Sequence, residues 1–213
     1  MEKEKIESES KSIAEYFEKY WTNYVNINFD KTFSLRNWAT IMATISLHYN
    51  ENNNKNYDYE NKLKSIFKNK KILHIGCGYG YFLEVIKSLN AVPFGIEPYC
   101  SFPENLNIAK ARVEDLQDNN SKLTKALNGE KFDAIVAHDV FVPTIIINKE
   151  NANKIIVSLK KYLNKKGVMV FENINEETLL EKDEIEKLSF KVEYIGNIAN
   201  PYGRICSQII ICN

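Results

Sequence analysis

The sequence lacks the features that mark membrane, secreted and metal-binding proteins. No apolar run among its 213 residues approaches the roughly 20 residues that cross a bilayer, and the charged start of the chain, residues 1–5, is unlike a secretory signal. The four cysteines form no CxxC pair and have no histidine at zinc-ligand spacing. We therefore expect a cytoplasmic protein with reduced thiols, no bound metal and no membrane partner.

An excess of charge of one sign is also absent. Lys and Arg together number 28, and so do Asp and Glu, so the chain lacks the net positive charge of proteins that grip phosphate backbones. The balance disfavours a nucleic acid partner without excluding one. Linkers rich in Pro, Gly or Ser are missing as well, which favours one compact unit. Nothing in the sequence indicates an oligomeric state.

Residues 1–69 are expected to form a helical extension. Apolar residues recur on one helical face over residues 6–24 and 32–49, and a third helix is predicted after the polar loop at 50–56, with Asp58 as its N-cap. Two interpretations of the aromatic stripe in the first helix stay open. Such a stripe is more often core, but Tyr20 and Trp21 are candidates for a lid over a bound ligand.

Strands and helices alternate over residues 70–213. Strands are predicted at residues 71–75, 92–96, 132–137, 168–172, 190–195 and 205–212, and helices from residue 81 and at 116–127, 153–163 and 176–188. Such alternation indicates a mostly parallel sheet with helices on both faces, so ligands are expected at the carboxyl ends of the strands. The last two strands have no helix between them, which predicts an antiparallel pair at the sheet edge. Tyr202, in the loop between these two strands, either overhangs an acceptor site or belongs to an ordinary hairpin connection.

A glycine turn follows the first strand. Residues 76–80 read Gly-Cys-Gly-Tyr-Gly, a turn that lets the backbone approach a ligand and presents N–H groups at the start of a helix. Dinucleotide sites carry GxGxxG, whose third glycine would fall at Tyr81, so the spacing here favours an adenosine thioether over a pyrophosphate. Glu97 ends the next strand, where a carboxylate can accept hydrogen bonds from both ribose hydroxyls.

These segments, with residues 132–137 and 159–167, resemble the successive motifs of class I S-adenosylmethionine-dependent methyltransferases of the small-molecule type. The resemblance implies an α/β, Rossmann-like sheet of seven strands in the order 3-2-1-4-5-7-6, with strand 7 antiparallel. It implies an enzyme that methylates oxygen, nitrogen or carbon of a small molecule and releases S-adenosylhomocysteine. The residues that it implies for cofactor binding are His74, Gly76, Cys77, Gly78, Tyr79, Gly80, Glu97, Pro98, Val113, Glu114 and Ala137.

Three positions depart from the family's pattern. His74 stands where the family usually has an acidic residue beside the methionine end of the cofactor, and residues 142–143 are Val-Pro where many relatives carry an acidic residue and a histidine. Arg112 replaces an Asp that commonly contacts adenine, so this contact is expected from Glu114 or Asp115. These departures leave open a cofactor-binding protein without transferase activity, in a regulatory or scaffolding role. Methylation of a macromolecule would need a basic face that the composition does not reveal.

His138 and Asp139 are the candidate catalytic pair. They follow the strand at residues 132–137, at the sheet end where the methyl group is expected, and an imidazole there can take a proton from a hydroxyl or amine. The alternative is that His138 is a loop residue that packs or caps. For His74, cofactor contact and plain packing are both open, and His48 is expected to be structural or at the surface.

Overall fold

The computed structural model describes residues 1–24, 29–49, 58–101, 104–146, 148–173, 179–199 and 205–213. The loop predicted at residues 50–56 and the proposed overhang by Tyr202 therefore lie outside the described residues. Tyr20 and Trp21 belong to a described helix, but their side chains lie outside the description.

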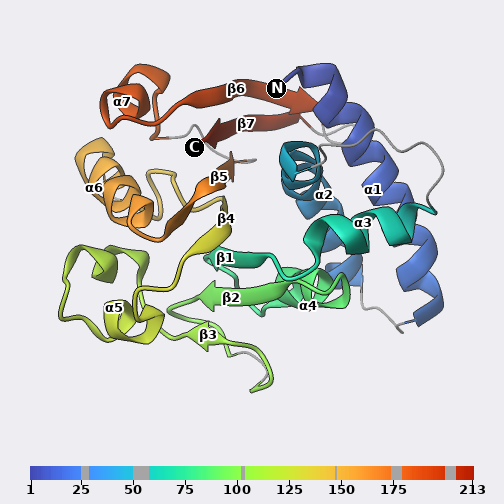
Figure 1. The fold of residues 1–213 in the computed structure, drawn as a ribbon, viewed down its shortest axis with the longest axis horizontal. Coiled ribbons are helices and arrows are strands. Elements are labelled where there is room, and N and C mark those ends of the chain that lie inside the picture. The colour runs from blue at the N-terminus through green and yellow to red at the C-terminus, as the bar shows by residue number, and fades with distance from the viewer. Residues whose placement is uncertain (25–28, 50–57, 102–103, 147, 174–178, 200–204) are drawn as a thin grey trace.

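Within the described residues, a seven-stranded sheet forms the centre of the fold, in the order β3-β2-β1-β4-β5-β7-β6 (Figure 1). The strands are β1 (Lys71–Ile75), β2 (Val92–Ile96), β3 (Ile108–Ala109), β4 (Phe132–His138), β5 (Leu163–Asn173), β6 (Val192–Ala199) and β7 (Ile205–Cys212). Strands β1 to β5 pair in parallel, and β7 runs antiparallel to both of its neighbours. The implied strand order and the antiparallel edge pair are confirmed. The two-residue strand β3 was not located from the sequence.

Helices cover both faces of the sheet. They are α1 (Lys3–Tyr24), α2 (Phe29–Tyr49), α3 (Tyr59–Phe67), α4 (Tyr81–Ser88), α5 (Lys122–Leu127), α6 (Lys149–Lys160), α7 (Lys182–Lys187) and the 3₁₀ helix η1 (Val113–Gln117). Figure 1 shows α1 to α4 on one side and α5 to α7 on the other. A hydrophobic core lies on each face of the sheet, and alternate residues of a strand point into one or the other. Ile72 and Val136 pack with α1 to α4, whereas Leu73 and Ile135 pack with η1 and α5 to α7.

The single helix predicted at residues 116–127 is wrong. The segment forms η1 and α5 with a turn between them. Asp118 accepts a hydrogen bond from the backbone N–H of Asn120 (2.8 Å), and the Ser121 hydroxyl accepts one from Thr124 (3.0 Å) as the N-cap of α5. Short polar side chains thus bind the backbone locally and interrupt the helix. Asp58 precedes α3 as predicted, but its side chain forms no capping hydrogen bond.

The N-terminal helices share a core with the sheet. Phe17 of α1 and Met42 of α2 are buried in the same cluster as Ile72 of β1. At the end of α2, the Tyr49 hydroxyl donates to the backbone carbonyl of Asp133 (2.6 Å), and the neighbouring His48 bonds the carbonyl of Lys166. The helices of residues 1–69 are therefore packed onto the sheet. Among the described residues, no helix has the length and apolar character needed to span a bilayer.

Candidate functional site

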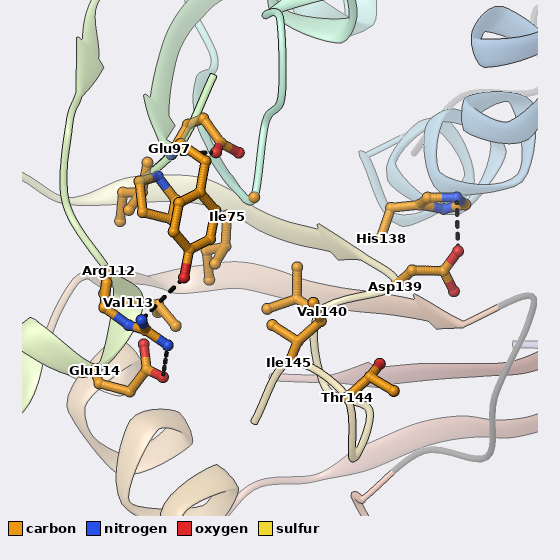
Figure 2. A pocket seen from close by; sticks show the side chains of 14 residues that line it. Ile75, Glu97, Arg112, Val113, Glu114, His138, Asp139, Val140, Thr144 and Ile145 are labelled. Carbon is orange, nitrogen blue, oxygen red and sulfur yellow. Dashed lines mark hydrogen bonds and ion pairs between the residues drawn. The ribbon is translucent and has the colours of Figure 1, made fainter. Parts of the chain in front are cut away.

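A pocket of about 250 Å³ opens at the carboxyl ends of β1, β2 and β4 (Figure 2). We call its two walls the β2 side (Glu97, Pro98, Tyr99, Arg112, Val113 and Glu114) and the β4 side (His138, Asp139, Val140, Thr144 and Ile145). Ile75, Gly76 and Ile96 complete the lining. The pocket brings together seven of the residues predicted for the site, namely Gly76, Glu97, Pro98, Val113, Glu114, His138 and Asp139.

The glycine turn connects β1 to α4 beside this pocket. The backbone N–H groups of Gly76 and Cys77 both donate to the carbonyl of Ile96, at 2.8 and 3.2 Å, which anchors the turn to the end of β2. Gly76 has a φ of +67°, and a Cβ there would lie 2.6 Å from Cγ2 of Val140, so the position requires glycine. Gly78 has a φ of +54° and open space where a side chain would be.

Five more residues predicted for cofactor binding lie outside the pocket lining. Cys77, Gly78, Tyr79 and Gly80 belong to the glycine turn, and Ala137 belongs to β4. Cys77 is buried, and burial raises the pKa of its thiol to about 12. Tyr79 is largely exposed, with its ring against that of Tyr81.

Glu97 links the turn to the end of β2. Its buried carboxylate accepts hydrogen bonds from the backbone N–H groups of Gly78 (3.0 Å), Tyr99 (2.7 Å) and Cys100 (3.2 Å). The last two bonds reach Oε1, and the first reaches Oε2. A carboxylate oxygen has two lone pairs, so Oε2 retains acceptor capacity for a hydroxyl in the pocket.

Tyr99 and Arg112 form a contact at the pocket that the sequence did not predict. Nη1 of Arg112 donates to the Tyr99 hydroxyl (2.9 Å), and Nη2 lies 3.6 Å from the Glu114 carboxylate, as the dashed lines in Figure 2 show. Asp115 instead accepts a hydrogen bond from the backbone N–H of Arg112 at the start of η1. Of the two acids expected near adenine, Glu114 lines the pocket and Asp115 caps the 3₁₀ helix.

His138, on the β4 side, lies between two carboxylates. Its Nδ1 is 3.2 Å from Oε2 of Glu172, and its Nε2 is 3.5 Å from Oδ2 of Asp139. Burial by itself lowers the pKa of His138, but the hydrogen bond to Glu172 and the charges of both carboxylates outweigh it, so the pKa lies above its ordinary value. Glu172 is fully buried in β5, 34 residues from His138, and the sequence did not single it out.

His74 does not line the pocket. It is buried in β1, with its ring edge-on to Phe82 at a centroid distance of 5.0 Å, so the packing alternative describes its position. Neither ring nitrogen has a hydrogen-bond partner among the described residues. Burial, with a smaller contribution from nearby His138, lowers the pKa of His74 to about 3.

The described residues offer no group of three or more acidic, His or Cys side chains that could hold a metal ion. Cys77, Cys100 and Cys212 are free thiols.

Comparison with known proteins points to one family. A family model described as a methyltransferase domain matches residues 45–207. A curated relative, the ubiquinone biosynthesis O-methyltransferase of Bartonella quintana (strain Toulouse), is 33% identical over 114 residues. That match covers 51% of this chain and 43% of the relative, so it spans less than half of the relative's length.

Solved structures share the fold. Magnesium protoporphyrin IX methyltransferase from Synechocystis PCC 6803, with bound SAM, has a TM-score of 0.53 at 13% identity and covers 95% of this chain and 96% of its own. The PH0226 protein from Pyrococcus horikoshii OT3 has a TM-score of 0.54 at 13% identity, with coverages of 93% and 98%.

Proposed function

Because the chain belongs to the family of methyltransferase domains, we propose that it transfers a methyl group from S-adenosylmethionine to a small molecule and releases S-adenosylhomocysteine. The observation that carries the proposal is the pocket itself, where the glycine turn, Glu97 and His138 meet at the carboxyl ends of the strands. S-adenosylmethionine supplies an electrophilic methyl group on a sulfonium, so orientation and exclusion of water supply much of the acceleration.

The β2 side fits the adenosine part of this cofactor. Oε2 of Glu97 has acceptor capacity for a ribose hydroxyl, and the lack of a side chain at Gly76 lets the backbone border the pocket. Pro98 and Val113 offer apolar contacts to adenine, and Glu114 offers an acceptor for its exocyclic amine.

The β4 side is the proposed acceptor site, with His138 and Asp139 as the catalytic pair. Tyr20 and Trp21, in the helical extension of residues 1–69, remain proposed lid residues, as does Tyr202. We place the protein in the cytoplasm, with a small-molecule substrate and without a nucleic acid or membrane partner.

The decisive test is calorimetric titration with S-adenosylmethionine and S-adenosylhomocysteine. Glu97→Ala should weaken binding by about 1–3 kcal/mol, because it removes a buried charged acceptor. Glu130→Ala is the matched control. Glu130 pairs with Lys71 at the amino ends of β1 and β4, away from the pocket, so this change should leave affinity unchanged. Absence of heat at millimolar ligand would refute the cofactor assignment, and unchanged affinity in Glu97→Ala would remove Glu97 from the site.

A binding protein without transferase activity is the second candidate. It is motivated by His74 and Val142, which are both buried in the core at positions where the resemblance to the family implies an acidic residue and a member of an acidic–histidine pair. Turnover to S-adenosylhomocysteine with a pool of metabolites separates the two functions. Equal rates in the wild type and in His138→Ala would dismiss His138 as the base.

A further inference from the structure

Three polar side chains, those of His74, His138 and Glu172, lie on one face of neighbouring strands. Side chains alternate along a strand, so His138 shares the face of Val136, and Glu172 shares the face of Val170, both of which pack with α1 to α4. His74 of β1 points to the same face, against Phe82 of α4. The fixed geometry of the sheet therefore sets the positions of both histidines and of Glu172.

Glu172 and His138 are direct cross-strand neighbours. The parallel register of β4 and β5 pairs the two residues, and the backbone N–H of Asp139 donates to the carbonyl of Glu172 (2.8 Å). The Glu172 side chain is fully buried, and that of His138 is 17% exposed at the pocket. Burial of a carboxylate is costly unless the charge is satisfied, and here the imidazole contributes to satisfying it.

The hydrogen bond to Glu172 selects one tautomer of His138. A carboxylate only accepts hydrogen bonds, so a carboxylate at Glu172 requires the proton of this bond to lie on Nδ1 of His138, 3.2 Å from Oε2 of Glu172. In the neutral ring, Nε2 is then the unprotonated nitrogen. It lies 3.5 Å from Oδ2 of Asp139, and both residues line the pocket. The ring is thereby prepared to receive a proton at Nε2.

We propose that Glu172 is a positioning residue that holds His138 as the proton acceptor for a hydroxyl group, so that the enzyme methylates oxygen. This inference rests on the proposed function. The acceptor O–H gives its proton to Nε2 of His138, and the oxygen bonds to the methyl carbon. The carbon–sulfur bond breaks with its electron pair left on sulfur, which yields the thioether S-adenosylhomocysteine.

The need for a base separates an oxygen acceptor from a nitrogen acceptor. A neutral amine attacks with its own lone pair before it loses a proton, whereas a hydroxyl is a weak nucleophile until its proton is removed. A histidine that a buried carboxylate holds in one tautomer can remove the proton of a hydroxyl acceptor.

The charged groups around His138 determine its pH dependence. Among the described residues, Glu172 of β5 and Asp139 favour the protonated ring, and His74 of β1 is neutral because its pKa is about 3. The base is active only when its ring is neutral, so the rate should rise with pH and level off above the ordinary histidine value of about 6.5.

The first test is the NMR titration of the histidine rings in the cofactor-free protein. The chain has only three histidines, and His138→Gln assigns the relevant signal. In the wild type, we expect His138 to carry its neutral-form proton on Nδ1. In the isosteric variant Glu172→Gln, we expect His138 to titrate at lower pH. Asp133→Asn, at the opposite end of β4, is the control and should leave the titration unchanged. An unchanged titration in Glu172→Gln would overturn the positioning role.

The second test measures S-adenosylhomocysteine formation with phenol and aniline as matched probe acceptors. We expect turnover with phenol and little with aniline. Glu172→Gln should lower kcat with phenol by about 10- to 100-fold with little change in KM, and should move the pH inflection downward. Glu172→Asp should recover part of the rate. Preference for aniline would overturn the assignment to oxygen.

The two levels of the proposal fail separately. Loss of the proposed function would appear as no binding of S-adenosylmethionine, or as binding without S-adenosylhomocysteine formation from phenol, aniline or the metabolite pool. The histidine titration needs no cofactor, and it decides the role of Glu172 by itself.

Discussion

His74 on β1 and His138 on β4 point to the same face of the sheet, yet their pKa values move in opposite directions. Burial lowers the pKa of His74 to about 3, and its ring nitrogens have no hydrogen-bond partner among the described residues. Burial also acts on His138, but Glu172 and Asp139 raise its pKa above the ordinary value. Carboxylates beside the ring, and not burial alone, therefore set the direction in which the pKa of a buried imidazole moves.

The largest expected effect is the acid sensitivity caused by His74. The unfolded chain binds a proton at this residue below about pH 6.5 and the folded chain does not, so stability falls by about 1.4 kcal/mol per pH unit as pH decreases. Between pH 6.5 and 4.5 this amounts to about 2–3 kcal/mol. His74→Leu should remove that loss, as measured by urea unfolding of both proteins across this range. Equal pH dependence in the two proteins would show that His74 is protonated in the fold.

His138→Gln should change the pH dependence of the free energy of unfolding by less than His74→Leu, and in the opposite direction. The folded-state pKa of His138 is raised, so its stabilising contribution is fully present below about pH 6.5 and is lost as pH rises through the folded value. The wild type should therefore exceed the variant in free energy of unfolding by more at pH 6 than at pH 9. The same urea series measures it, and a difference that grows toward pH 9 would contradict the arrangement of carboxylates around His138.

Asp139→Asn should have the smallest effect, which we expect on the pKa of His138. The Asp139 contact to His138 is longer than that of Glu172, 3.5 against 3.2 Å, and the Asp139 side chain is more exposed, 27% against 0%. Asparagine also tolerates the φ of +51° at this position, so the backbone should be retained. NMR titration should show the pKa of His138 lowered by less than in Glu172→Gln. A larger shift from Asp139→Asn would reverse the ranking of the two carboxylates.

The strongly patterned parts of the fold could be predicted from the sequence. β1 and β2 have the predicted bounds because each is a short apolar run next to a glycine or proline signal, and the alternation of strands and helices indicated the sheet. The predicted helix at residues 116–127 failed because Asp118 and Ser121 bind the backbone locally, a contact that apolar periodicity does not report. β3 is two residues long, too short for any periodicity.

The residues of the site also differ in how far the sequence indicated them. Glu97 could be predicted because it ends a strand next to the glycine turn, and its place at the pocket agrees with that position. Glu172 could not, because only strand register brings it beside His138. The signal available in the sequence was an acidic residue at the end of the run Val168–Phe171, where a fully buried strand predicts apolar residues. Arg112 and Tyr99 meet across the gap between two strand ends, which no local pattern encodes.

The position of β7 between β5 and β6 has a consequence for biogenesis. In the finished sheet, Glu172 of β5 is paired with Ile209 of β7, a strand that the ribosome makes after β6. Until β7 inserts, β5 is therefore a sheet edge, and the backbone at Glu172 lacks its pairing partner on that side. Non-local pairing of this kind is slow to form. The strand that carries Glu172 thus has both of its neighbours only after β7, which the chain reaches last, has inserted between β5 and β6.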